Sequence, residues 1–221
     1  MKLPFTADQF FDVFARYHAG VWPAPVVLTG LAALALGLVF WPAPAAGRWI
    51  AAILALLWAW MALAYHLAYF AAVNPAARLF AALFLLGATG FAWVGVVRRR
   101  LRFAPTSAAR GWVGAALLLY ALVAYPALSQ FLGHRYPALP TFGLPCPTTI
   151  FTIGLLMLAR SPVPRSVFVV PVLWSLVGAT AAFSLGVWQD LGLFAAAAAG
   201  LAALIRPATV FEPSLSDRRP A

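Results

Sequence analysis

Seven apolar runs, separated by Pro, Gly or Arg, fill most of this chain, at residues 24–41, 49–70, 76–97, 111–132, 147–160, 166–187 and 190–205. An α-helix needs roughly 20 apolar residues to cross the hydrocarbon core of a bilayer. The chain is 64% hydrophobic and only 9% charged, whereas about a quarter of the residues in a soluble domain are charged. The sequence therefore predicts an all-α membrane protein with seven transmembrane helices.

The basic residues divide unequally between the two ends of these predicted spans. The N-terminal side holds four of the 15, namely Lys2, Arg16, Arg78 and Arg135, and the opposite side holds the other eleven. Because Lys and Arg concentrate in cytoplasmic loops, we expect the N-terminus outside and the C-terminus in the cytoplasm. Orientation in a bilayer then explains the net charge of +10, and we expect the bilayer, not a nucleic acid, as the partner.

The pattern divides the chain into an interfacial amphipathic helix in residues 1–22, a transmembrane domain in 23–206 and a disordered cytoplasmic tail in 207–221. In the first region Thr6 and Gln9 have the spacing of a capping box. The aromatic residues that follow share one helical face. Such a helix suits the membrane interface, and a helix packed over the end of the bundle explains the pattern equally well.

Paired prolines indicate an internal repeat. Pro23 and Pro25 open the first run as Pro145 and Pro147 open the fifth, and each run ends in another such pair. This spacing favours a three-plus-one-plus-three parallel repeat of the kind found in some secondary carriers. Prolines are also common at helix starts, so independent occurrence explains the same pairs.

The fifth run is too short for a full crossing. A helix from Cys146 to Arg160 extends only about 21 Å, less than the hydrocarbon thickness. We expect the Pro-rich segment 140–145 to dip into the membrane, buried in protein, with Pro147 at the first helical position and Cys146 as the N-cap. The alternative is a tilted bundle in a locally thin membrane, with Cys146 as a small buried filler.

Polar residues of the predicted outer half suggest a site. His66 lies inside an apolar run, where an ionisable side chain usually faces the bundle interior. We predict an outward-facing pocket lined by His66, Asn74, His134, Cys146, Thr148 and Thr149. His66, His134 and Cys146 would suit a thiophilic metal ion, although no metal-binding motif is present. A hydrogen bond from His66 to a carbonyl group or a tyrosine is the simpler explanation.

The sequence argues against an enzyme and against a resident cofactor other than such a metal ion. We expect none of the acidic residues, Asp8, Asp12, Asp190, Glu212 and Asp217, to lie within a span. Glycine-rich phosphate loops, GxSxG and paired carboxylates are missing from the sequence. Catalysis would therefore depend on a lone thiol and a histidine.

Three stretches carry a resemblance to a known family: PFTADQF at the start, YHLAYFAAVNPAA after the second run, and GHRYPALPTFGLPCPTTIFTIG before the fifth. Together they resemble an uncharacterised family of bacterial integral membrane proteins, defined as a domain of unknown function. The resemblance covers nearly the whole chain. It implies a multi-pass bacterial membrane protein and assigns no functional residue.

We therefore hypothesise an inner-membrane protein that binds or transports a small solute or a metal ion through the outward-facing pocket. A monomer or a homo-oligomer would agree with this hypothesis. The alternative is a non-catalytic partner or assembly subunit of a larger membrane complex. The Ala-rich stretch AAAAAGLAA in the last run suits the alternative, because small residues let helices approach closely.

Overall fold

The computed structural model describes residues 4–41, 43–160 and 162–205, so the tail at 207–221 lies outside the described residues. Within these ranges the regular structure is helical, apart from two isolated β-bridges. The α-helices are α1 (Ala7–Val21), α2 (Ala24–Phe40), α3 (Ala46–Trp60), α4 (Ala77–Phe91), α5 (Ala109–Leu119), α6 (Tyr125–Phe131), α7 (Pro145–Met157), α8 (Ser166–Leu185) and α9 (Gly192–Ile205).

Short π-helical and 3₁₀ turns extend several of these helices. Met61–Leu67 continues α3 in π-helical form, Ala92–Val97 continues α4, and Tyr120–Ala124 joins α5 to α6 in one rod. The 3₁₀ turns are Phe70–Ala72, after the extended α3, and Trp188–Leu191, which leads into α9. The all-helical prediction is confirmed, and the rods begin and end close to the predicted runs.

Five helical rods of the described chain are long and apolar enough to cross a membrane, and six if the bent pair α1 and α2 counts as one span. The short α7 is not among them. These helices are compatible with a multi-pass membrane protein. Seven crossings and the orientation stay predictions.

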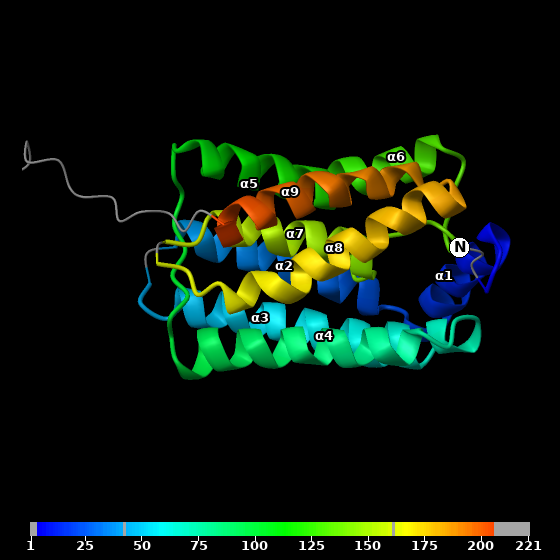
Figure 1. Ribbon diagram of the computed structural model, residues 1–221, viewed down its shortest axis with the longest axis horizontal. Coiled ribbons are helices and arrows are strands. Elements are labelled where there is room, and N and C mark those ends of the chain that lie inside the picture. The colour runs from blue at the N-terminus through cyan, green and yellow to red at the C-terminus, as the bar shows by residue number, and fades with distance from the viewer. Residues whose placement is uncertain (1–3, 42, 161, 206–221) are drawn as a thin grey trace, which may run out of the picture.

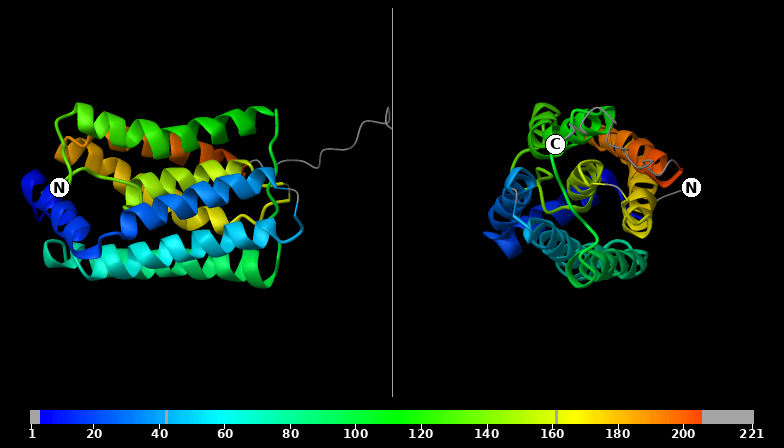
Figure 2. Two further views of the ribbon diagram at one scale, coloured as in Figure 1. Left: turned by 180° about the vertical axis from the view of Figure 1, so that it is seen from behind. Right: turned by 90° about the vertical axis from the view of Figure 1, so that its left-hand side faces the viewer.

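The α7 helix lies in the middle of the bundle, and the other long helices surround it (Figures 1 and 2). Every residue of α7 except Cys146 is buried. A helix that is apolar on all sides is expected in such a position. In the predicted repeat α2 corresponds to α7, yet α2 lies in the surrounding ring (Figure 2). The two halves therefore occupy unlike positions, and this arrangement does not support the repeat.

Glycines allow α5 and α7 to approach closely. A Cβ atom on Gly114 would lie 2.8 Å from the carbonyl oxygen of Gly154, and one on Gly154 would lie 3.1 Å from that of Gly114. Small residues at a helix crossing permit this kind of backbone contact. The central helix is thus held directly against the backbone of α5.

The segment before α7 is folded into the protein. Pro140, Phe142, Gly143 and Leu144 are buried, as expected for irregular backbone inside an apolar bundle. Gly143 has a φ of 95°, in the region that glycine tolerates best. The helix starts at Pro145 with Leu144 as its N-cap, so the prediction of Cys146 as the cap is wrong. The first of the two prolines, rather than the second, occupies the first helical position.

Candidate functional site

The α1 helix covers one end of the bundle and lies across its long axis (Figure 1), at 88° to α2. The predicted capping box is confirmed: the Gln9 backbone N–H donates to Thr6 Oγ1 at 3.2 Å, and the Thr6 N–H donates to Gln9 Oε1 at 2.9 Å. Phe10, Val13 and Phe14 are buried on the inner face. The apolar face of this helix therefore packs on protein.

His18 ties α1 to the segment before α7. Its Nδ1 lies 2.6 Å from the carbonyl oxygen of Pro137, and its Nε2 lies 2.9 Å from Thr141 Oγ1. A neutral ring that donates from Nδ1 and accepts the Thr141 hydroxyl proton at Nε2 satisfies both contacts. Burial lowers the pKa of His18, and the Pro137 carbonyl partly opposes this shift. The neutral form is therefore the one that the folded protein favours.

Tyr17 makes a second tie. Its hydroxyl donates to the carbonyl oxygen of Gly143 at 3.4 Å and accepts the Trp60 indole N–H at 2.7 Å. Burial raises the pKa of Tyr17 to about 12, although the Trp60 bond lowers it in part. The hydroxyl thus stays protonated at neutral pH and remains a donor. The two ties fix α1 over the space beneath it.

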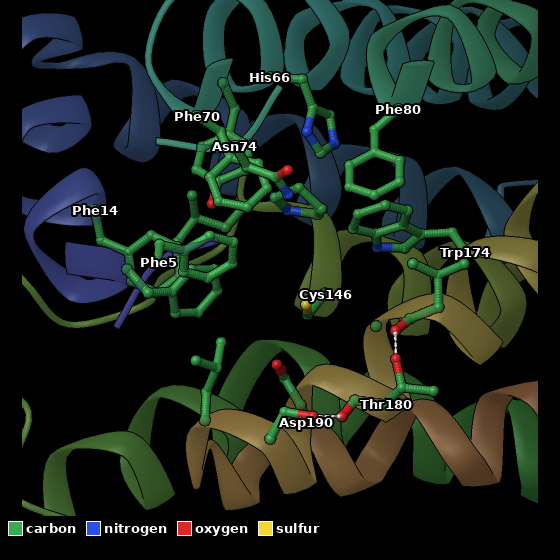
Figure 3. A pocket seen from close by; sticks show the side chains of 18 of the residues that line it. Phe5, Phe14, His66, Phe70, Asn74, Phe80, Cys146, Trp174, Thr180 and Asp190 are labelled. Atoms are coloured by element: carbon green, nitrogen blue, oxygen red, sulfur yellow. Dashed lines mark hydrogen bonds between the residues drawn. The ribbon is translucent and has the colours of Figure 1, made fainter. Parts of the chain in front are cut away.

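That space is a cavity of about 130 Å³, seen from close by in Figure 3. Aromatic rings form most of its wall. They come from α1 and the residues before it, from the end of the extended α3, and from α4 and α8: Phe5, Phe10, Phe14, Tyr65, Phe70, Phe80 and Trp174. A smaller polar set points into the same space, and it includes His66, Cys146 and Asp190 (Figure 3).

His66 lies in the π-helical turn Met61–Leu67, and its side chain is fully buried. Neither ring nitrogen has a hydrogen-bond partner within the described protein. The ring centroids of Phe84 and Trp174 lie 4.7 Å and 5.2 Å from that of His66. An unpaired buried polar group costs roughly 1–3 kcal/mol, and π-helical turns are frequent at functional sites. The arrangement is therefore typical of a binding position rather than of a packed core.

Trp174 carries a second unpaired donor. This side chain is 6% exposed, and its indole N–H has no acceptor in the described protein. Trp58 is the contrasting case, because its N–H donates to Thr152 Oγ1 at 3.0 Å. His66 and Trp174 thus lie next to each other at the cavity, and both side chains have polar atoms without a hydrogen-bond partner in the described protein.

Asp190 forms the opposite wall, within the turn Trp188–Leu191. Its carboxylate is 1% exposed. Oδ1 accepts the Tyr125 hydroxyl proton at 2.5 Å, and the Cys146 thiol lies beside it. The expectation that no acidic residue lies within a span is wrong for Asp190, because this residue falls inside Trp188–Ile205, a helical stretch long and apolar enough to cross a membrane.

The predicted pocket residues separate into two groups. His66, Asn74 and Cys146 line the cavity, although Asn74 Oδ1 also accepts the Ala76 N–H at 3.1 Å. Thr148 and Thr149 are buried in α7 away from the cavity wall. The Thr148 hydroxyl accepts the Gly143 N–H at 3.2 Å, so it stabilises the turn before the helix.

His134 lies apart from this group. Its ring stacks on Phe11 with the centroids 4.0 Å apart, and it is not part of the cavity wall. The structure therefore does not bring His66, His134 and Cys146 together as the three ligands of one metal ion. Among the residues that the structure describes, no three or more His, Cys, Asp or Glu side chains form a group suited to a metal.

Sequence reasoning missed Asp190, Trp174 and the α1 aromatic residues as cavity residues. A usable signal existed for Trp174, because it lies in the middle of an apolar run, whereas interfacial tryptophans mark the ends. Asp190 gave a weaker signal, since an acid at the edge of an apolar run is ordinarily solvated. The role of Phe5, Phe10 and Phe14 depends on the bend between α1 and α2, which no local pattern specifies.

Fold and site together define a class: a helical protein with several helices apolar enough to cross a membrane, a buried central helix, and an aromatic cavity closed at one end by an amphipathic helix. Within that class the chain belongs to a family of unknown function, DUF6064, whose family model matches residues 7–214. Comparisons with curated proteins and with solved structures give no match.

Proposed function

We propose that this protein binds a small molecule in the aromatic cavity beneath α1. The observation that carries the proposal is the pair His66 and Trp174, two buried side chains whose ring N–H groups and ring nitrogen have no partner within the described protein. A concave, largely apolar space with a few convergent polar groups is typical of ligand sites. Transport of the same molecule would use this site as its outer binding position.

We further propose that the chain crosses the bacterial inner membrane seven times, with α1 on the outer side. The support is the distribution of arginine along the bundle. The loops after α2, α4 and α7 lie at the end away from α1 (Figure 1). They and the adjoining helix starts carry eight arginines: Arg48, Arg98, Arg99, Arg100, Arg102, Arg110, Arg160 and Arg165. The described part of the α1 end carries three, Arg16, Arg78 and Arg135, and the positive-inside tendency then assigns the sides.

The site supports binding without a chemical step. A metal ion ranks behind a molecular ligand in this proposal, because His134 lies apart from Cys146 and His66. Asp190 already accepts the Tyr125 hydroxyl. These contacts favour recognition by shape and hydrogen bonding.

Extraction of bound molecules from the purified full chain tests the proposal. Cys146→Leu fills the cavity and Cys146→Ser keeps it open, so the two variants form a matched pair. We expect a compound to co-purify with the wild type and with Cys146→Ser. The amount of this compound per protein should be about tenfold or more lower for Cys146→Leu, since overpacking a site costs roughly 1–3 kcal/mol. Equal yields from all three proteins, measured by mass spectrometry of solvent extracts, would overturn the proposal.

A partner or assembly subunit is the second candidate function. The observation that favours it is a row of exposed small residues along α9, Ala195, Ala198 and Ala202, at which another helix could pack closely. Purification in mild detergent separates the two functions. A second protein in fixed stoichiometry supports a subunit role, and a single species supports binding alone.

A further inference from the structure

We propose that the ligand is an uncharged, mainly apolar molecule with one oxygen acceptor, and that it enters from the side of the bundle along α8. This inference rests on the proposed binding function and adds the chemical class of the ligand and its route. Three observations carry it: the position of the opening, the hydrogen-bonding capacity inside, and the size of the enclosed space.

The opening lies on the flank of the bundle. Val177, Thr180 and Ser184 of α8 line the cavity and are also exposed, so the cavity meets the surface along this helix. Val177 precedes the last residue of α8, Leu185, by about 12 Å of helix axis. We call these three residues the α8 rim. If α8 crosses the bilayer, the α8 rim faces acyl chains, and a molecule that reaches it arrives from the membrane.

The polar groups inside favour an acceptor on the ligand. Trp174 offers an indole N–H, and a neutral His66 offers one N–H and one unprotonated nitrogen. A carbonyl oxygen has two lone pairs and can accept from both side chains. The cavity wall contains no Lys or Arg among the described residues, so an anion would find no counter-charge there.

Asp190 carries the only carboxylate in the described cavity wall, yet it does not make a cation as good a ligand as a neutral acceptor. Its Oδ1 accepts a hydrogen bond from Tyr125, and the Cys146 thiol lies next to it. Among the described residues of the cavity wall, the fully buried polar atoms without a hydrogen-bond partner belong to His66 and Trp174, on the other side of the space (Figure 3). Aromatic rings do bind ammonium groups, and a cationic probe is therefore part of the test.

The enclosed volume limits the buried part of the ligand. A cavity on the order of 150 Å³ holds a benzene ring in another protein, and this one measures about 130 Å³. A single ring or a short branched group with its carbonyl fits inside. An attached chain would leave past the α8 rim and lie along the outside of the bundle.

Binding of three matched probes to the full chain in lipid nanodiscs tests this inference. Nonanophenone carries a phenyl ketone on an alkyl chain, nonylbenzene lacks the oxygen, and 1-phenylnonylammonium replaces it with a charge. Saturable binding is measured with tritiated probe against empty nanodiscs. We expect the ketone to bind one site per chain, and the hydrocarbon to bind about ten- to a hundredfold more weakly, as loss of one or two hydrogen bonds predicts.

Variants locate the site. His66→Leu and Trp174→Phe should each weaken ketone binding about tenfold, whereas Trp58→Phe, which removes an indole N–H already bonded to Thr152, should not change it. Thr180→Trp at the α8 rim should slow association. Leu173→Trp, on an exposed part of α8 that does not line the cavity, should have no effect.

Three results would overturn the inference. They are hydrocarbon binding as tight as ketone binding, binding of the ammonium probe tighter than that of the ketone, or an affinity for the ketone that is unchanged in both His66→Leu and Trp174→Phe. Failure of the inference differs from failure of the proposed function. If no probe binds but Cys146→Leu still loses an extracted polar compound, the cavity binds a ligand of another class. If no probe binds and the extracts are equal, the binding function itself is wrong.

Discussion

His18 shows at the residue scale how one side chain holds the cover of the cavity. Burial keeps the pKa of His18 below its ordinary value, so the unfolded or detached segment binds a proton at a higher pH than the folded one. Stability therefore falls as the pH drops below about 6.5, where the detached ring begins to bind its proton. Tyr17 and Tyr136 are the aromatic rings that face His18, and the Tyr17 hydroxyl stays protonated at this pH.

We expect amide hydrogen exchange in residues 7–21 to accelerate between about pH 8 and about pH 5, after correction for the intrinsic rate. The variant His18→Gln retains a donor and an acceptor but does not titrate, and it should lose most of this pH dependence. Asp8 and Asp12 of the same helix are unchanged in the variant and serve as the internal control. The same acceleration in both proteins would assign the effect to another group.

Residue identity alone predicted part of the site. His66 was a candidate because an ionisable side chain in an apolar run is costly and usually faces the bundle interior. The structure places it at the cavity. Cys146 lines the cavity, but it is not the N-cap of α7, because two prolines compete for the first helical turn. Thr148 and Thr149 were assigned to the pocket by their nearness in sequence to Cys146. Successive helical residues point about 100° apart, so Thr148 turns to the far side of α7. Thr149 returns to nearly the same side as Cys146, but it lies one turn further along the helix and does not line the cavity.

At the scale of the element, the crossing of α5 and α7 depends on two glycines. A Cβ atom on Gly154 would approach Leu118 Cγ at 3.0 Å and the Gly114 carbonyl oxygen at 3.1 Å. Gly154→Leu should therefore push α5 away from the central helix and destabilise the protein by about 1–3 kcal/mol. The measurement is the thermal unfolding midpoint in detergent.

Gly37 provides the matched control for this prediction, since nothing lies within 4 Å of the Cβ position there. Gly37→Leu adds the same side chain to α2 and should leave the midpoint nearly unchanged. Leu favours a helix more than Gly does, so a similar loss in both variants would mean that an added leucine side chain on any helix, rather than the crossing, causes the effect.

The helical elements themselves were largely readable from the sequence. Apolar runs with Pro, Gly and Arg at their ends locate each rod, because an uncharged stretch of this length has few alternatives to a helix. The shortness of the fifth run correctly indicated an unusual segment before α7. The π-helical turn that holds His66 was not predicted, since its extra residue per turn leaves no mark on an all-apolar pattern.

At the scale of the whole molecule, the central position of α7 could not be read from the chain. Every apolar helix in a membrane protein has the same lipid-compatible composition, so composition does not tell which helix is surrounded by the others. Paired prolines favoured a repeat, in which α2 and α7 would be equivalent. Instead, α7 alone lies in the centre. Its Gly154 packs against Gly114 of α5, and its Thr152 accepts a hydrogen bond from Trp58 of α3.

Sidedness is the property of the whole molecule on which the direction of the cavity depends. In a Cys146→Ser background, Asp8→Cys and Ser107→Cys each place an exposed thiol at one end of the bundle. We expect a membrane-impermeant maleimide to label Asp8→Cys in intact spheroplasts and to label Ser107→Cys only after permeabilisation. The reverse pattern would put the arginine-rich end outside, against the positive-inside tendency. Replacing Arg98, Arg99, Arg100 and Arg102 with Gln should raise the labelling of Ser107→Cys in intact spheroplasts, because the excess of basic residues on that side would fall from seven to three.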